Sequence, residues 1–132
     1  MALPAGPTIL IVDDEPSIRT LLRYILGREC FRVLEAEDGE RALELARTER
    51  PDVMVLDVMM PRQNGFEVCR MLRQEPATAA LPILLLTAKD TPIDRARAVQ
   101  AGATEYFCKT CDKDLLIAAI RRYLPAARQV RS

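Results

Sequence analysis

Residues 8–14 read TILIVDD, a short apolar run that ends in two adjacent acids. The stretches 53–57 (VMVLD) and 83–87 (ILLLT) have the same form, about four apolar residues followed by a polar one. Apolar runs this short, without alternating polar residues, are typical of strands that are buried on both faces of a parallel sheet. The three stretches therefore predict the centre of a parallel sheet, with a polar side chain at the end of each strand.

Short apolar runs alternate with segments of helical period along the whole chain. The predicted strands are 9–12, 31–36, 53–56, 83–86 and 106–108. The predicted helices are about 18–26, 39–49, one opening at 64, 92–101 and 116–124. This alternation predicts an α/β fold, one domain of five βα units with helices on both faces of a parallel sheet.

The helices carry their own sequence signals. Apolar residues recur at helical spacing in the first helix (Ile18, Leu21, Leu22, Ile25, Leu26). Asn64 with Glu67, and Thr91 with Asp94, are candidate capping boxes for the third and fourth helices. The fourth helix has the weakest apolar stripe (Ile93, Ala96, Val99), so we expect it to be the most loosely held.

Composition limits the chemistry. The chain has 132 residues, 49% of them hydrophobic, which suits one domain with a core. Basic and acidic residues number 19 each, so we expect no broad nucleic-acid surface. Histidine is absent, which excludes a histidine base, a Ser-His-Asp triad and His-ligated zinc within this chain.

The ends of the chain and its cysteines point to the compartment. We expect an N-terminal extension at 1–7, the domain at 8–124, and a basic tail or the start of a linker at 125–132. Four cysteines do not require a disulfide framework in a domain of this size. With no signal peptide or membrane-spanning run predicted, a cytoplasmic protein is expected.

Polar residues gather at the carboxyl ends of four predicted strands. They are Asp13 and Asp14, Asp57, Thr87 and Lys109. In an open parallel sheet, this edge forms ligand sites where the strand order reverses. Each residue alone has a structural explanation, as a helix cap, a turn residue or a solvated charge. Together they favour a shared site.

The residue types in this set predict phosphoryl-transfer chemistry. Three clustered carboxylates repel one another unless a hard cation such as Mg²⁺ neutralises them. Lys109 and Thr87 supply a cation and a hydroxyl donor for a phosphoryl group. An aspartate can itself be the nucleophile, and Asp57 is the candidate.

The motifs IVDDEP at 11–16, VLDVMMP at 55–61, LLLTA at 84–88 and YFCK at 106–109 together resemble the receiver domains of two-component response regulators. The resemblance covers about residues 8–124. It implies a flavodoxin-like fold with strand order 2-1-3-4-5. It also implies that Asp57 accepts a phosphoryl group from a histidine on a partner kinase or phosphotransfer protein.

The resemblance also assigns roles to single residues. Asp14, Asp57 and the backbone carbonyl of Met59 would bind Mg²⁺, while Asp13 would act mainly through a bound water. Lys109 would pair with the phosphoryl oxygens, Thr87 would donate its hydroxyl to them, and Ala88 would leave room for the group. These assignments follow from matching positions in the motifs.

The output would be a switch. Thr87 would move toward the phosphoryl group and Tyr106 would turn inward behind it, which would shift the surface formed by the fourth helix, the fifth strand and the fifth helix. A downstream protein would read that surface. The domain would be a monomer or a phosphorylation-dependent dimer.

The loop after Lys109 departs from the family pattern. Receiver domains usually have proline there, often after a cis bond, whereas this chain has Thr110. A cis bond before a non-proline residue costs about 2.5 to 4 kcal/mol, so we expect a trans bond. The loop also contains a Cys-x-x-Cys spacing, Cys108 to Cys111, which we interpret as coincidental. Its oxidation, which would misplace Lys109, is a testable hypothesis.

Three other functions fit parts of the pattern. A small Mg²⁺-dependent phosphohydrolase with Asp57 as nucleophile would usually have a second acid where this chain has Met59, and a cap domain. A flavodoxin-like FMN carrier would need a hydroxyl-rich loop after the first strand. A phosphorylation-independent binding module would not need the acids, Thr87 and Lys109. A receiver is not a conventional enzyme, but Mg²⁺-dependent self-phosphorylation and autodephosphorylation at Asp57 are expected.

Overall fold

The computed structural model describes residues 6–88 and 90–125. Within these ranges, five strands alternate with five helices, as the apolar runs predict. The strands are β1 (Thr8–Val12), β2 (Arg32–Ala36), β3 (Val53–Asp57), β4 (Ile83–Thr87) and β5 (Glu105–Cys108). The helices are α1 (Pro16–Gly27), α2 (Gly39–Glu49), α3 (Gly65–Gln74), α4 (Pro92–Ala101) and α5 (Lys113–Tyr123).

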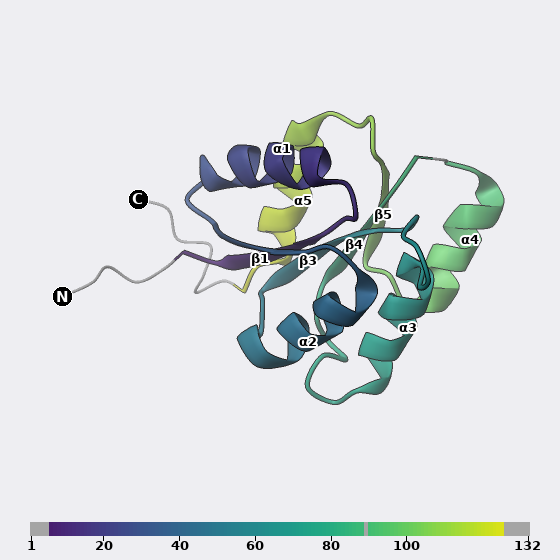
Figure 1. The fold of residues 1–132 in the computed structure, drawn as a ribbon. Coiled ribbons are helices and arrows are strands. Elements are labelled where there is room, and N and C mark those ends of the chain that lie inside the picture. The colour runs from purple at the N-terminus through teal and green to yellow at the C-terminus, as the bar shows by residue number, and fades with distance from the viewer. Residues whose placement is uncertain (1–5, 89, 126–132) are drawn as a thin grey trace.

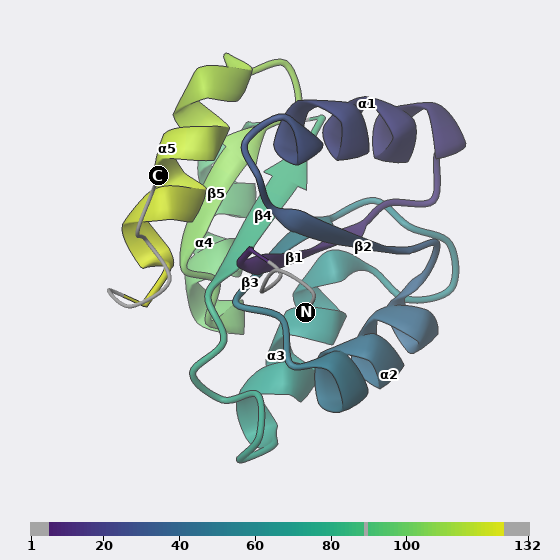
Figure 2. The same ribbon diagram turned by 90° about the vertical axis from the view of Figure 1, so that its left-hand side faces the viewer.

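The strands form one parallel sheet in the order β2-β1-β3-β4-β5. Helices α1 and α5 cover one face, and α2, α3 and α4 cover the other, as Figure 1 shows with the sheet nearly edge-on and Figure 2 shows after a quarter turn. This is the flavodoxin-like fold with helices on both faces, as expected. The strand order reverses between β1 and β3, so the topological switch point of the sheet lies between these two strands.

Alternate residues of each central strand enter opposite core layers. Leu10 and Leu56 pack beneath α2 and α3, whereas Ile9 and Val55 pack against α1 and α5. All four side chains are almost fully buried. Burying an aliphatic side chain of this size stabilises the fold by about 1.5 to 3 kcal/mol. The two layers therefore hold the central strands, and with them the strand ends, in fixed register.

Local caps begin the helices. The predicted capping box at α3 is complete: the Asn64 side chain accepts from the Glu67 N–H at 3.0 Å, and the Glu67 carboxylate accepts from the Asn64 N–H at 3.0 Å. At α4 the Thr91 hydroxyl accepts from the Asp94 N–H, but it also donates to the Asp94 carboxylate. The pair at α4 is therefore a side-chain cap without the reciprocal backbone bond.

Two predicted apolar faces are wrong in part. The α4 stripe of Ile93, Ala96 and Val99 is exposed, and the helix instead buries Ala98 and Ala101. Small side chains let α4 lie close to the body of the domain, so its larger apolar residues point outward. In α1, Leu21 is also exposed, at 45%.

The outermost elements begin with β1 at Thr8 and end with α5 at Tyr123, and the domain bounds 8–124 stay a prediction. The predicted N-terminal extension and C-terminal tail lie largely outside the described residues. Within 6–88 and 90–125, no helix has the length and apolar character needed to cross a membrane.

Candidate phosphoryl-transfer site

The sheet register brings the predicted acids to one level. Val12 pairs with Leu56 across β1 and β3, so the next residue on each strand line, Asp13 and Asp57, lies at the same edge. The Asp13 N–H continues the ladder to Ala36 of β2. Asp13 and Asp57 therefore lie at the carboxyl ends of β1 and β3, at the topological switch point of the sheet.

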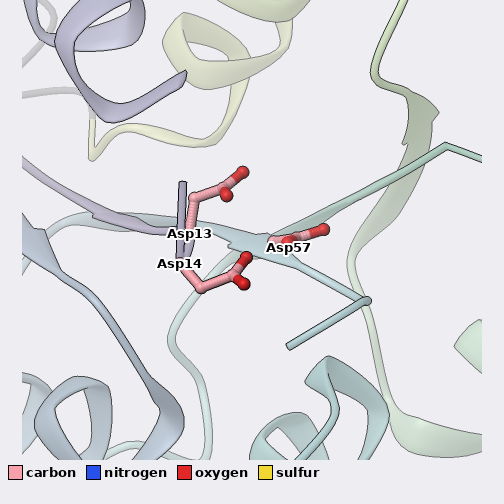
Figure 3. A group of neighbouring side chains, drawn as sticks. All are labelled: Asp13, Asp14 and Asp57. Atoms are coloured by element: carbon pink, nitrogen blue, oxygen red, sulfur yellow. The ribbon is translucent and has the colours of Figure 1, made fainter. Parts of the chain in front are cut away.

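Asp13, Asp14 and Asp57 form an acidic cluster. Each offers a carboxylate oxygen, and these oxygens all lie within 4.8 Å of one another. Figure 3 shows the three side chains gathered where β1 and β3 end. Asp13 and Asp57 are each only 1% exposed, whereas Asp14 is exposed. The cluster thus consists of two buried carboxylates, Asp13 and Asp57, and one exposed carboxylate, Asp14.

Asp13 and Asp14 are not the cap residues of α1. The N-cap is Glu15, whose side chain makes no capping bond, and the Asp13 carboxylate accepts instead from the Glu15 N–H at 3.0 Å. The capping explanation for the acid pair is therefore not supported. The Asp13 carbonyl also accepts from the Arg19 guanidinium at 2.7 Å.

Lys109 follows β5 and reaches into the acidic cluster. Its ammonium lies 3.1 Å from the Asp13 carboxylate, 3.2 Å from Asp57 and 3.7 Å from Glu15. Burial lowers the pKa of Lys109, but hydrogen bonds and charges from Asp13 and Asp57 outweigh it and leave the pKa raised. The lysine is therefore a fixed positive charge in the site at neutral pH.

The two oxygens of Asp57 have different surroundings. Oδ1 accepts from the Met59 N–H at 3.2 Å and pairs with Lys109. Oδ2 is buried and has no hydrogen-bond partner among the described residues. A buried carboxylate oxygen without a partner is costly. Asp13 Oδ2 also makes no hydrogen bond within the described ranges, but it lies 3.1 Å from the Lys109 ammonium, so Asp57 Oδ2 is the oxygen with the greater need of a further ligand.

Burial and the nearby charge of Asp13 raise the pKa of Asp57 to about 6, although Lys109 and the Met59 N–H oppose the rise. Burial dominates because it disfavours the charged carboxylate. Asp57 is therefore mainly ionised at neutral pH, as a nucleophile requires.

The donor set fits a hard divalent cation. Mg²⁺ prefers oxygen ligands and commonly uses one or two carboxylates together with water and phosphate oxygens. The clustered carboxylates and the unpartnered Asp57 Oδ2 offer such ligands. The role of the Met59 carbonyl stays a prediction; the Met59 side chain is 60% exposed.

Thr87 and Tyr106 lie on the neighbouring strands β4 and β5, and their side chains contact each other. Thr87 ends β4 and is 2% exposed. Burial raises the pKa of Tyr106, and a hydrogen bond with the Thr87 side chain opposes part of that rise. The Arg95 guanidinium of α4 stacks over the Tyr106 ring at 5.5 Å. The predicted switch residues are therefore in contact with each other and with α4.

The loop after Lys109 has a trans bond, as we expect, since no peptide bond in the described ranges is cis. The loop begins as a turn in which the Cys111 N–H donates to the Cys108 carbonyl at 3.0 Å. Both cysteines are free and partly buried. A hydrogen bond with Thr110 lowers the pKa of the Cys108 thiol.

Sequence reasoning missed two basic side chains beside the site. Arg19 donates to the Asp13 carbonyl, and the Lys113 ammonium donates to the Lys109 carbonyl at 2.8 Å. One signal was available. Lys109 and Lys113 are two of only three lysines in the chain and lie four residues apart.

Comparison with known proteins gives a consistent result. Residues 9–121 match the model of the response regulator receiver domain. The chain is 52% identical over 101 residues to the alkaline phosphatase synthesis transcriptional regulatory protein PhoP of Bacillus subtilis, covering 76% of this chain and 41% of PhoP. The chain spans about half the length or less of the first curated relatives that it matches.

Solved structures agree with these relatives. The chemotaxis protein CheY4 of Vibrio cholerae superposes with a TM-score of 0.85 at 33% identity, over 91% of this chain and all of CheY4. The receiver domain of the sensor histidine kinase PA1611 from Pseudomonas aeruginosa gives a TM-score of 0.83 at 30% identity, over 90% of this chain and 98% of that domain. That structure has a magnesium ion coordinated in its active-site cleft.

The phosphohydrolase, flavin-carrier and binding-module alternatives are not favoured by these matches. Fold, strand order, the acidic cluster and the motif spacing agree with one family. The chain belongs to the receiver domains of two-component response regulators.

Proposed function

We propose that Asp57 accepts a phosphoryl group from a phosphohistidine of a partner protein, in a reaction that requires Mg²⁺. The observation that carries the proposal is the Asp57 carboxylate itself. It is buried, has one oxygen without a hydrogen-bond partner among the described residues, and lies 3.2 Å from the ammonium of Lys109, which follows β5. These are the features of a nucleophile placed against a phosphoryl-binding cation.

In the proposed reaction, one carboxylate oxygen of Asp57 attacks phosphorus, and the other stays available as a metal ligand. A P–O bond to Asp57 forms and the P–N bond to the partner histidine breaks, so the imidazole leaves with the electron pair of that bond. The Lys109 ammonium would pair with the phosphoryl oxygens in place of the carboxylates, and the Thr87 hydroxyl would donate a hydrogen bond to one of those oxygens. Asp14, Asp57 and the Met59 carbonyl would hold Mg²⁺, with Asp13 acting mainly through a bound water, and the ion supplies charge neutralisation for the phosphoryl oxygens when bound.

The absence of histidine from this chain fits a donor in another protein. We expect the phosphoryl donor to be a histidine kinase or a histidine phosphotransfer protein, because these proteins carry the phosphohistidine. Zero formal net charge argues against nucleic-acid binding through this domain, and the cytoplasm is the compartment in which we expect it to act.

The output face is formed by α4, β5 and α5. Phosphorylation adds about −1.5 to −2 charge and three acceptor oxygens at Asp57. The Thr87 hydroxyl would move toward that group, and Tyr106, which contacts Thr87, would move with it. The Arg95 contact to the Tyr106 ring would carry the change to α4, where a downstream protein or a second copy would bind.

Labelling with a small phosphodonor tests the nucleophile. The full 132-residue chain is incubated with acetyl phosphate and Mg²⁺, and the gain of one phosphoryl group is followed by intact mass. We expect labelling of the unaltered protein, loss of labelling with EDTA and no labelling of Asp57→Asn. Asp90→Asn, which removes an exposed aspartate outside the cluster, is the matched control and keeps labelling. Full labelling of Asp57→Asn would reject Asp57 as the acceptor.

The same preparation tests autodephosphorylation. After removal of acetyl phosphate, we expect the label to be lost with time in Mg²⁺, and more slowly in EDTA. Steady turnover of p-nitrophenyl phosphate, with no stable acyl phosphate accumulating at Asp57, would favour the phosphohydrolase instead.

A further inference from the structure

Lys109 is held through its backbone as well as through its side chain. Its N–H donates to the Thr87 carbonyl at 2.7 Å, and its carbonyl accepts from the Lys113 ammonium at 2.8 Å. The first contact ties Lys109 to the end of β4, and the second ties it to the first turn of α5. Together they fix the peptide planes on both sides of the residue whose ammonium enters the site.

Lys113 occupies a position where a lysine is otherwise unfavourable. It is the first residue of α5, and the positive end of the helix dipole lies there. The N-cap Asp112 and the following Asp114 are the residues that suit this end of the helix. Lys113 is nevertheless partly buried, and its ammonium is directed at a single carbonyl. A contact with Lys109 gives the lysine a role that helix stability does not explain.

Among the described residues, the other contacts within the loop between the two lysines do not involve the Lys109 carbonyl, and one of them is the hydrogen bond between the Cys108 thiol and the Thr110 hydroxyl at 3.1 Å. Thr110 is exposed and, unlike proline, leaves its own φ angle free to vary. The turn bond from the Cys111 N–H to the Cys108 carbonyl closes the loop but does not involve the Lys109 carbonyl. The Lys113 ammonium is therefore the contact that orients the peptide plane directly after Lys109.

We propose that Lys113 is a positioning residue for phosphoryl transfer, which holds the Lys109 ammonium between Asp13 and Asp57. The inference rests on the proposed function of Asp57 and Lys109. Without Lys113, the loop would sample orientations in which the Lys109 ammonium leaves the carboxylates, and fewer molecules would be ready to bind the phosphoryl oxygens.

Rates of labelling by acetyl phosphate test the proposal in the full chain. Loss of one ordinary, partly exposed hydrogen bond corresponds to about a 2- to 12-fold change, so we expect Lys113→Ala to be labelled about that much more slowly. Lys113→Arg keeps a charged donor of similar length and should restore most of the rate. Arg122→Ala is the matched control, because it removes a positive charge from the far end of α5, where Arg122 pairs with Glu105.

A second measurement reports Lys109 directly and needs neither metal nor phosphodonor. With only three lysines, the ¹⁵N signals of the ammonium groups are few enough to assign. In the metal-free unaltered protein, we expect the Lys109 ammonium to exchange its protons slowly. In Lys113→Ala that signal should broaden, and in Lys113→Arg it should persist.

The outcomes separate the two proposals. If the unaltered protein is labelled and Lys113→Ala matches it in both rate and Lys109 signal, Lys113 has no positioning role while the proposed function stands. If Lys113→Arg is as slow as Lys113→Ala, a positioning hydrogen bond is also rejected. If the unaltered protein is not labelled at Asp57, both proposals fail.

Discussion

At the scale of single residues, the ionised Asp57 carboxylate lowers the free energy of unfolding of the metal-free protein at neutral pH. Its pKa is about 6 in the folded chain against 3.8 as the ordinary value. A group that binds its proton more tightly in the folded state contributes its full stability below pH 3.8 and loses it as the pH rises through 6. The difference is about 3 kcal/mol at pH 7.5, at 1.36 kcal/mol for each pH unit.

We therefore predict that Asp57→Asn stabilises the metal-free protein at pH 7.5, by about 1 to 3 kcal/mol. The gain should shrink steadily between pH 6.5 and 4.5, because the unaltered carboxyl then becomes neutral. Urea unfolding in EDTA at several pH values measures the difference. Thr87→Val, at another buried polar position of the same edge, is the control and should show no such pH dependence. A destabilised Asp57→Asn at pH 7.5 would contradict the prediction.

At the scale of elements, the end of α4 depends on a glycine. Gly102 has a φ angle of +90°, and a Cβ there would lie 2.9 Å from the Arg73 side chain. That side chain also donates from Nε to the Gly102 carbonyl at 2.8 Å and from a terminal nitrogen to the Leu81 carbonyl at 2.6 Å. Arg73 thus joins the end of α4 to the loop before β4, and Gly102 makes room for it.

We predict that Gly102→Ala costs about 1 to 2 kcal/mol in the free energy of unfolding, because alanine disfavours the left-handed conformation. Gly27→Ala in α1 is the matched control. A Cβ at Gly27 meets nothing within 4 Å, so alanine should be neutral or stabilise by up to about 1 kcal/mol. Urea unfolding measures both, and equal effects of the two substitutions would show that the conformation at Gly102 does not matter.

The turn after β5 allows the oxidation hypothesis to be tested. Cys108 and Cys111 are the first and fourth residues of a hydrogen-bonded turn, in which Cα atoms lie less than about 7 Å apart. Disulfides need a similar Cα separation. Diamide would take two electrons and two protons from the thiols, forming a disulfide and a hydrazine. We predict slower labelling of Asp57 after oxidation, because Lys109 lies within the turn.

Labelling by acetyl phosphate before and after diamide measures this effect. The experiment uses a Cys30→Ser background, since Cys30 is exposed and would react on its own. The further change Cys111→Ser is the control and should remove the sensitivity to diamide, while dithiothreitol should restore the rate in its parent. An unchanged rate in a protein shown by mass to contain the disulfide would dismiss the hypothesis.

The elements also show what local sequence can predict. The three central strands are correct because each contains a continuous apolar run, and the common edge of the acids that end β1 and β3 follows from the register of a parallel sheet. The α4 face was wrong because Ala98 and Ala101 pack closely where larger residues would not fit, and hydrophobicity ranks Ile93 and Val99 above them. The Lys113 contact depends on the path of a loop, which no periodic pattern encodes.

At the scale of the whole molecule, the same two strands build both the core and the site. Both core layers pass through β1 and β3, and those strands carry Asp13 and Asp57 at their ends. A ligand at this edge therefore binds only when the central strands are paired. Binding energy at the acidic cluster should appear in the unfolding of the entire domain, since a ligand that binds only the folded state stabilises all of it.

We predict that Mg²⁺ raises the free energy of unfolding at pH 7.5, by about 2.7 kcal/mol when its concentration is 100 times the dissociation constant. The gain should be smaller at pH 5, because protons compete for Asp57 below its pKa of about 6. Calorimetric titration gives the dissociation constant, and urea unfolding with and without Mg²⁺ gives the gain. Asp57→Asn should lose most of it, whereas Asp90→Asn, altered outside the cluster, should keep it. An equal gain in Asp57→Asn would mean that Mg²⁺ acts elsewhere on the chain, and would remove the metal from the proposed site.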